Sequence, residues 1–357
     1  MVYPPNSQLP QERVYVPYPV QPSAAPNPYM PPAVPCDRGN PEEKRSLGKT
    51  ACGLCWMLVV VVALMVSIPS AANLFLQSVG FRWLGNNEYG GYTPLLYYLV
   101  NGVTYILAFA IPPLFYLKIK HISLTDALPF QKTKFGTSLA CIALGMGVCM
   151  LANYPANWVA DLLDRMGVNG TLPDSPLNGE PSIQILYFIS LAVIPPIVEE
   201  LVFRGAILHG LRRFGDGFAI LGSAFLFGMF HGNFIQIPFA FLCGLVLAFV
   251  VVKTGNLWVS IVIHFINNGM AAAMTLLERQ IGDGMANALY MLAFYVWIVL
   301  GIIAVIFLAV RRQRFFSVER SASTLRGSQK FGKLVGNAGA IVLLVYCILS
   351  CFLMLYL

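Results

Sequence analysis

Apolar residues are grouped into nine segments that polar connections separate. As helices rising 1.5 Å per residue, most of these segments are long enough to cross about 30 Å of hydrocarbon. Helices are expected because every backbone polar group in lipid needs an internal partner. The pattern therefore predicts an all-α, polytopic transmembrane helical bundle with about eight to nine spans. The segments cover approximately residues 51–77, 92–117, 136–157, 183–210, 218–231, 235–252, 256–276, 287–310 and 334–357.

The chain ahead of these segments has a different pattern. Residues 1–48 are rich in Pro and Tyr and have almost no clusters of aliphatic side chains. Such a segment buries too little apolar surface to offset the entropy lost on ordering. We therefore expect a disordered cytosolic N-terminal tail over residues 1–48, followed by a helical membrane domain over residues 51–357.

Composition agrees with a membrane protein, because the 357-residue chain is 57% hydrophobic and only 11% charged. The net charge of +7 does not indicate a nucleic-acid partner. The basic residues lie mainly in the connections, where they set topology, and these connections share one side if every segment crosses. We expect an integral, multi-pass protein with a cytosolic N-terminus, in the plasma membrane if the source is bacterial. These basic residues include Lys44, Arg45, Lys49, Lys118, Lys120, Lys132, Lys134, Arg212, Arg213 and Lys253.

Three charged residues interrupt an otherwise almost wholly apolar stretch at residues 194–204: Glu199, Glu200 and Arg204. An ionised side chain at membrane depth costs on the order of 2.5–3.5 kcal/mol by insertion scales, so it is rarely incidental. Glu200 and Arg204 stand four apart, which places them on one helix face within ion-pair reach. Glu199 is rotated by about 100° from Glu200. This spacing predicts that Glu200 and Arg204 set the geometry while Glu199 performs chemistry; a structural salt bridge with a spare acid is the alternative.

Two histidines and one asparagine add polar groups to later apolar segments: His231, His264 and Asn268. His264 and Asn268 are four apart and share a helix face. By helical rise, Glu199, His231 and His264 lie about 14 to 21 Å from the ends of their segments on the side of the basic connections. These three side chains are therefore predicted to converge at one level of the membrane. The alternative for each histidine alone is a hydrogen-bonded core residue.

The predicted cluster supports two kinds of hydrolytic chemistry. A glutamate paired with a histidine can take a proton from water and later deliver it to a leaving amine. A second histidine and a carboxamide can donate hydrogen bonds to the oxyanion of a tetrahedral intermediate. Alternatively, Glu199, His231 and His264 could hold a zinc ion. The residue types leave both mechanisms open.

The motifs Glu199-Glu200-x-x-x-Arg204, Phe227-x-x-x-His231 and His264-x-x-x-Asn268 resemble, in this order, those of the CPBP family of intramembrane proteases. The family comprises CAAX-type prenyl-protein endopeptidases and bacteriocin-processing or self-immunity proteins, also called the Abi family. The resemblance covers about residues 90–275.

The resemblance implies that Glu199 and His231 activate water and that His264 and Asn268 form the oxyanion site. It also implies that Glu200 and Arg204 support the fold. The family has been described as zinc-dependent metalloproteases, and a glutamate-dependent mechanism without metal also fits it. We expect no tightly bound metal.

The sequence thus predicts an intramembrane endopeptidase that acts on a membrane-associated substrate, lipidated or bacteriocin-like. Its expected partners are a membrane-anchored peptide or protein and the lipid bilayer, with no nucleic acid. One alternative is a non-catalytic membrane immunity or peptide-binding protein of the same fold. The other is a proton-coupled transporter, which would use intramembrane Glu and His as a relay but typically shows repeated halves that are not evident here.

Overall fold

The computed structural model describes residues 40–78, 93–168, 170, 175–311, 314–318 and 323–355. Within these residues the regular elements are helices, and the only β-type pairing is a single bridge between Phe130 and Asn256. The predicted all-α fold is confirmed. Residues 1–39, which make up most of the predicted tail, lie outside the described residues.

The helices follow the predicted apolar segments, and each of the nine segments falls on one or more of them. The elements are α1 (Pro41–Ser78), α2 (Pro94–Ile119), α3 (Leu124–Ala127), α4 (Phe135–Arg165), α5 (Pro181–Phe188), the π-helix η2 (Ile189–Val193), α6 (Ile194–Glu200), the π-helix η3 (Leu201–Ile207), α7 (Leu208–Arg212), α8 (Asp216–Phe230), α9 (Gln236–Thr254), α10 (Leu257–Ile281), α11 (Asp283–Arg311), α12 (Gly327–Val335) and α13 (Ala338–Leu353).

The described residues contain seven helices long and apolar enough to cross a membrane. The stretch Pro181–Arg212 counts as one of them, although it passes through two π-helical sections. The count rises to eight if α12 and α13, which are bent by 71° at their junction, form one span. Helix α8 is apolar but has only 15 residues. The protein is therefore a multi-pass integral membrane protein, as predicted.

Helix α1 begins at Pro41, whereas the apolar pattern placed its start at residue 51. Proline suits the first turn of a helix because backbone N–H groups there have no intrahelical acceptor, so the missing N–H costs no hydrogen bond. Asn40 Oδ1 accepts a hydrogen bond from the backbone N–H of Glu42, at 2.9 Å. Glu42 and Glu43 also place negative charge at the positive end of the helix dipole. Residues 41–48 are therefore helical, not part of an unstructured tail, because capping rather than hydrophobicity starts this helix.

Two adjacent prolines, Pro195 and Pro196, shape the span that carries the glutamates. Neither residue has a backbone N–H, so the Leu191 carbonyl has no donor either four or five residues ahead of it. The preceding turn is the π-helix η2, in which the Ile194 N–H donates to Ile189 O. Wide turns of this kind often occur at functional sites. The sequence pattern predicted a helix here and did not reveal its π-helical sections.

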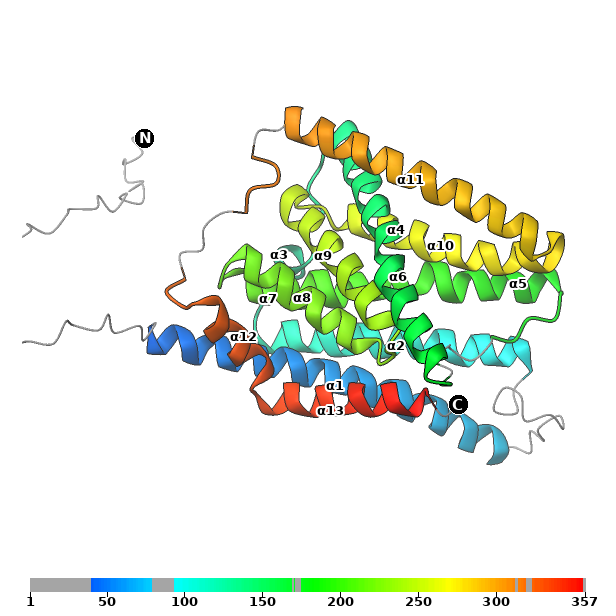
Figure 1. The fold of residues 1–357 in the computed structure, drawn as a ribbon. Coiled ribbons are helices and arrows are strands. Elements are labelled where there is room, and N and C mark those ends of the chain that lie inside the picture. The colour runs from blue at the N-terminus through cyan, green and yellow to red at the C-terminus, as the bar shows by residue number, and fades with distance from the viewer. Residues whose placement is uncertain are drawn as a thin grey trace, which may run out of the picture. The chain divides into compact units, whose positions relative to one another are not determined.

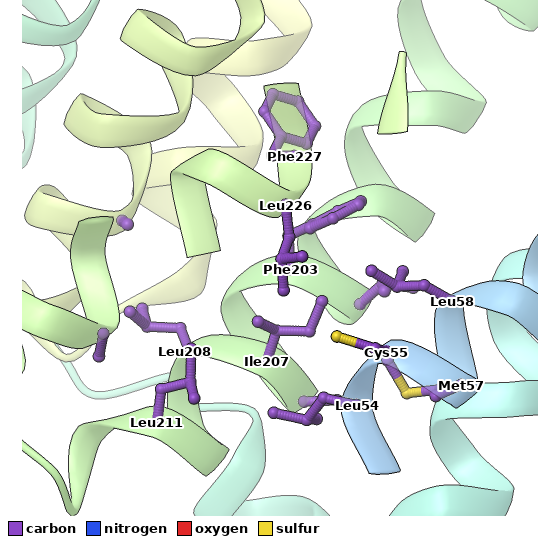
Figure 2. Close-up of a cluster of buried hydrophobic side chains, with 14 of the residues drawn as sticks. Leu54, Cys55, Met57, Leu58, Phe203, Ile207, Leu208, Leu211, Leu226 and Phe227 are labelled. Atoms are coloured by element: carbon purple, nitrogen blue, oxygen red, sulfur yellow. The ribbon is translucent and has the colours of Figure 1, made fainter. Parts of the chain in front are cut away.

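The buried apolar core joins the first helix to the span of the glutamates. Figure 2 shows side chains of α1, among them Leu54 and Leu58, facing those of η3 and α7, among them Ile207 and Leu211. Helix α13 lies beside α1, and α11 lies beside α4 (Figure 1). Helices α8 and α9 form another closely packed pair. This packing surrounds α6 and η3, which carry Glu199, Glu200 and Arg204, with other helices.

Candidate active site

A cavity of about 320 Å³ brings the predicted polar residues together. Glu199 on α6 and His231 at the end of α8 line this cavity. His264 and Asn268 line it from α10. The predicted convergence of these segments is thus present in the structure. The other lining residues are Cys149, Met150, Asn153, Tyr187, Leu191, Phe227, Gln236, Phe239, Ala240, Cys243, Leu247, Asn267, Met270, Ala271, Ala272, Thr275 and Tyr290.

Glu200 and Arg204 form the ion pair that their spacing predicted. Arg204 Nη1 lies 2.9 Å from Glu200 Oε1, and both side chains are fully buried. The guanidinium also donates from Nη2 to the Gly244 carbonyl at 3.4 Å. Its carbon atom lies 4.3 Å from the centroid of the Phe227 ring, which adds a cation–π contact. Groups from α6, α8 and α9 therefore hold the cation of η3 and tie these elements together.

His264 links the two neighbouring glutamates. Its Nδ1 lies 3.0 Å from Glu200 Oε1, and its Nε2 lies 3.8 Å from Glu199 Oε2. Because a carboxylate only accepts hydrogen bonds, Nδ1 carries the proton in the bond to Glu200. This contact fixes the imidazole ring and directs Nε2 towards Glu199. The i,i+4 pair of Glu200 on α6 and Arg204 on η3 thus orients a histidine on α10, which its spacing alone could not reveal.

Glu199 has two carboxylate oxygens in different surroundings. Oε1 accepts a hydrogen bond from the Tyr105 hydroxyl of α2. Oε2 is buried, and no hydrogen-bond partner for it is present among the described residues. The residue is only 5% exposed, yet it lines the cavity. One oxygen is thus fixed by the protein, and the other has no hydrogen-bond partner in the part of the chain that the structure describes.

Tyr105 was not among the residues that the sequence singled out. Its hydroxyl stands in an apolar span, as many tyrosines do, and no spacing connects it with Glu199, which is 94 positions away. The Tyr105 ring stacks on Phe109 with centroids 4.5 Å apart, and this contact holds the hydroxyl in place. The only available signal was a hydroxyl within an apolar segment, which is too common to identify a site.

His231 sits just after α8 and is oriented by its own motif. Its Nδ1 lies 2.8 Å from the carbonyl oxygen of Phe227, four residues earlier. A carbonyl only accepts, so Nδ1 is the donor and Nε2 of the neutral ring is an acceptor. The Phe227 ring packs edge-on against both His231 and His264, with centroids 4.8 and 5.8 Å away. The phenylalanine of the motif therefore positions both histidines.

Asn268 donates a hydrogen bond to a backbone carbonyl that the two prolines leave without a helical donor. Its Nδ2 donates to the Leu191 carbonyl at 3.1 Å, the group that Pro195 and Pro196 leave without a helical partner. Asn267 Nδ2 donates to Asn268 Oδ1 at 3.2 Å and so restrains the orientation of the carboxamide. Asn267 also lines the cavity and was not predicted from the sequence. A carboxamide has two N–H groups, so one remains for a ligand.

Metal coordination is the alternative chemistry for Glu199, His231 and His264. Among the described residues, no three His, Cys, Asp or Glu side chains are grouped closely enough to hold a metal ion. Each imidazole uses Nδ1 for a hydrogen bond, since His231 Nδ1 bonds Phe227 O and His264 Nδ1 bonds Glu200, and each keeps Nε2 for a ligand. The same kind of bond occurs in metal-bound histidines, which coordinate through the other ring nitrogen. The steps proposed below use no metal.

Residues 181–270 match the family model described as Type II CAAX prenyl endopeptidase Rce1-like. The matched segment contains all three motifs and most polar residues of the cavity, with Asn153, Thr275 and Tyr290 outside it. The match confirms the resemblance to CAAX-type prenyl endopeptidases that the motifs predicted.

Two curated bacterial proteins are similar to parts of this chain. The "Putative membrane peptidase YdiL" of Bacillus subtilis (strain 168) is 24% identical over 147 residues, which cover 41% of this chain and 60% of that protein. The "Membrane-embedded CAAX protease MroQ" of Staphylococcus aureus (strain USA300) is 32% identical over 102 residues, which cover 27% of this chain and 40% of that protein. The chain thus spans less than two thirds of either relative. The comparison with solved structures found no match.

Proposed function

We propose that this multi-pass membrane protein, whose residues 181–270 match the Rce1-like CAAX prenyl endopeptidases, is an endopeptidase that uses water activated by Glu199. The observation that carries the proposal is Glu199 Oε2, a buried carboxylate oxygen without a hydrogen-bond partner among the described residues. Glu199 lines a cavity that also contains two histidines and three asparagines. A carboxylate so placed suits the work of a general base.

In the proposed first step, Glu199 Oε2 takes a proton from a water molecule while the oxygen attacks the peptide carbonyl carbon. The Tyr105 hydrogen bond to Oε1 keeps the carboxylate turned towards the cavity. His231 presents Nε2 as an acceptor and helps to orient the same water. When the tetrahedral intermediate collapses, the proton held by Glu199 passes to the leaving amine, and the carboxylate is regenerated.

The negative oxygen of the intermediate would be stabilised by His264 and Asn268. His264 donates from Nδ1 to Glu200, so it can donate from Nε2 as well only in its imidazolium form. The carboxylates of Glu199 and Glu200 flank this ring and would compensate that charge. Asn268 has one N–H directed to Leu191 and offers the other. Each such donor typically contributes about 10²–10³-fold to the rate.

The proposed substrate is a peptide or protein held at the membrane, either lipidated or bacteriocin-like. The similarity to a protein named as a membrane-embedded CAAX protease supports a lipidated substrate. The cavity combines its polar groups with apolar side chains such as Met150, Phe239 and Leu247, which suits a partly apolar ligand. We further propose that the N-terminus is cytosolic, because basic residues predominate in the connections on that side.

The test is peptidase activity of the purified full-length protein towards fluorogenic peptides with and without a prenyl group. Glu199→Gln should lower turnover by about 10²–10⁴-fold, because an amide cannot accept the proton. Glu278→Gln, on α10 outside the cavity lining, is the matched control and should retain wild-type activity. Unfolding temperatures of both variants should remain near that of the wild type.

Each result has a defined meaning. Wild-type turnover in Glu199→Gln would contradict the proposal. Binding of the reporters without cleavage, unchanged in Glu199→Gln, would favour a non-catalytic peptide-binding protein. Activity that persists with a strong chelator would support the metal-free mechanism. Activity lost on chelation and restored by zinc would overturn that mechanism and make Glu199, His231 and His264 the candidate ligands.

A further inference from the structure

A second concave site lies where three helix ends meet. It is a pocket of about 710 Å³ between the first turns of α1, the end of α2 and the end of α7. Since α1 begins, α2 ends and α7 ends there, the pocket lies at one end of the helical bundle, where spans meet the membrane surface. Its lining consists of Ser46, Lys49, Thr50, Tyr116, Lys120, Ile122, His209, Gly210, Arg212, Arg213 and Asp216. None of these residues belongs to the cavity of Glu199.

The pocket carries a strong excess of positive charge. Lys49, Lys120, Arg212 and Arg213 line it, and Asp216 is its acidic residue. Asp216 is occupied by Arg212, whose Nε and Nη2 lie 2.7 and 3.2 Å from its two carboxylate oxygens. Neither Lys49 nor Lys120 forms an ion pair with an acid in the part of the chain that the structure describes. Three cations therefore face the pocket without a compensating carboxylate.

Arg213 is held in position rather than extended freely into solvent. Its Nη2 donates to the Thr50 hydroxyl of α1, and its guanidinium carbon lies 4.7 Å from the Phe214 ring centroid. These contacts leave other guanidinium N–H groups of the fork for a ligand. Hydroxyls of Ser46 and Tyr116 line the same pocket. A guanidinium held in position, with ammonium and hydroxyl donors around the same concave space, forms the usual environment for a phosphate group.

The topological role of basic residues does not by itself explain this arrangement. Lys132 and Lys134 lie in the connection that also contains Lys120, so they are on the same side of the bundle. They are exposed and are not among the residues that line this pocket. Membrane topology requires only that positive charges lie on one side of the membrane. The basic residues of the pocket, in contrast, come from three helices and surround one concave space. The concave arrangement is the feature that points to a ligand.

The surroundings of the pocket favour a lipid over a soluble anion. On α2, Phe115 and Ile119 precede the lining residues Tyr116 and Lys120 and expose 63% and 55% of their surface. Such large apolar side chains at the edge of a multi-pass bundle suit contact with acyl chains. A ligand with a phosphate head and apolar tails would therefore satisfy both the pocket and its edge. Basic pockets between spans are recognised sites for anionic headgroups.

We propose that this pocket binds the phosphate headgroup of an anionic phospholipid. The proposal is independent of the peptidase function, because it uses other residues and its test measures binding. The test is native mass spectrometry of the full-length protein in detergent, titrated with phosphatidylglycerol or with phosphatidylcholine of the same chain length. The pocket variant carries Lys49→Gln and Lys120→Gln, and the matched control carries Lys132→Gln and Lys134→Gln.

Phosphatidylglycerol should bind the wild type and the control alike and the pocket variant at least about tenfold more weakly, given the contribution of each lysine near an anionic lipid. Phosphatidylcholine should bind all three proteins weakly. All four lysines are exposed, so the folded state should be preserved and equal unfolding temperatures would verify it.

Three outcomes would overturn the proposal. Equal loss in the pocket and control variants would indicate general electrostatic attraction. Equal affinity for the two lipids would exclude selection by charge. Displacement of phosphatidylglycerol by inorganic phosphate, with the phosphate itself binding through Lys49 and Lys120, would assign the pocket to a soluble anion.

Discussion

Two buried cations in this protein are stabilised in different ways. Arg204 lies in the span of the glutamates and pairs with Glu200 at 2.9 Å. Lys330 of α12 is 6% exposed, and its Nζ donates to the backbone carbonyl of Phe214 at 2.6 Å. No acid lies within ion-pair distance of Lys330 among the described residues. The first cation therefore belongs to a charged network, whereas the second uses neutral groups, the Phe214 carbonyl and the Phe218 ring, whose centroid lies 6.0 Å from Nζ.

Their positions explain the difference. Phe214 follows α7 at the end of the bundle, so the long stem of Lys330 can be covered while its ammonium reaches a helix-end carbonyl. Arg204 is in the interior of its span, where an uncompensated charge costs several kcal/mol. Its counter-ion Glu200 in turn binds His264, which faces Glu199. In the described residues, each buried acid, and the buried histidine, lies within residues 181–270.

The largest expected effect comes from removing the counter-ion of Arg204. Glu200→Gln should lower the free energy of unfolding by about 3–5 kcal/mol, because it leaves a buried guanidinium unpaired. Activity should fall too, since His264 loses its acceptor. The measurement is denaturant or thermal unfolding in detergent followed by circular dichroism.

The matched control is the double variant Glu200→Gln with Arg204→Met, which removes both charges. It should recover much of the lost stability but not the activity. A double variant as unstable as the sum of its single changes would show that the two residues act independently.

The next effect concerns the hydroxyl that fixes Glu199. Tyr105→Phe should reduce turnover by about 10- to 100-fold, because hydrogen bonds to charged groups contribute about 1.5–3 kcal/mol. Stability should change little, since the ring and its stacking on Phe109 remain. The peptidase assay with prenylated reporters measures this, and Tyr154→Phe, at a residue 60% exposed, is the control. Equal activity of the two variants would contradict a positioning role for Tyr105.

A smaller effect is expected where Asn268 compensates for the prolines. Asn268→Ala should cost about 1–3 kcal/mol of stability, because the Leu191 carbonyl is left without a donor. Pro195→Ala restores an N–H four residues after Leu191, so the double variant should be less destabilised than the sum of the single variants. Thermal unfolding of the four proteins completes a double-mutant cycle. An additive result would contradict this compensation.

The smallest effect is expected at the second buried cation. Lys330→Met keeps a long side chain and removes one hydrogen bond to a backbone carbonyl, which should cost about 0.5–1.5 kcal/mol. Peptidase activity should remain at the wild-type level, because no contact of Lys330 reaches the cavity of Glu199. Thermal unfolding and peptidase activity, measured on the same preparation, test the predicted loss of stability and the predicted unchanged activity. A loss comparable to that of Glu200→Gln would remove the distinction between the two cations.

Much of the fold and the membership of the site followed from local patterns. Hydropathy located the apolar spans, though not the start of α1, since the length of an apolar run determines whether it can cross a bilayer. The Glu200–Arg204 pair followed from helical spacing, and it survives the π-helical geometry of η3. The prediction that Glu199, His231 and His264 lie at one level of the membrane followed from helical rise. The number of residues to the end of each apolar segment gives the depth of the side chain. These are all properties of single helices.

Other features depend on how separate helices pack, and no spacing along the chain encodes them. Tyr105 reaches Glu199 from α2, and His264 reaches Glu200 from α10. The prolines before Glu199 were visible in the sequence, but the donor that replaces their missing N–H groups comes from Asn268, 77 positions after Leu191. The basic residues at the membrane surface were equally visible, and the pocket exists because the start of α1 meets the ends of α2 and α7.

The sequence by itself therefore determined an all-helical membrane protein with Glu199, His231 and His264 in three of its apolar segments. Only the tertiary structure decided which hydrogen-bonding atom of each residue already has a partner and which residues line one cavity. The physical reason is that membrane insertion depends on the summed hydrophobicity of one segment. Hydrogen-bond partners depend on the rotation and register of neighbouring helices, which side-chain packing determines over the whole bundle.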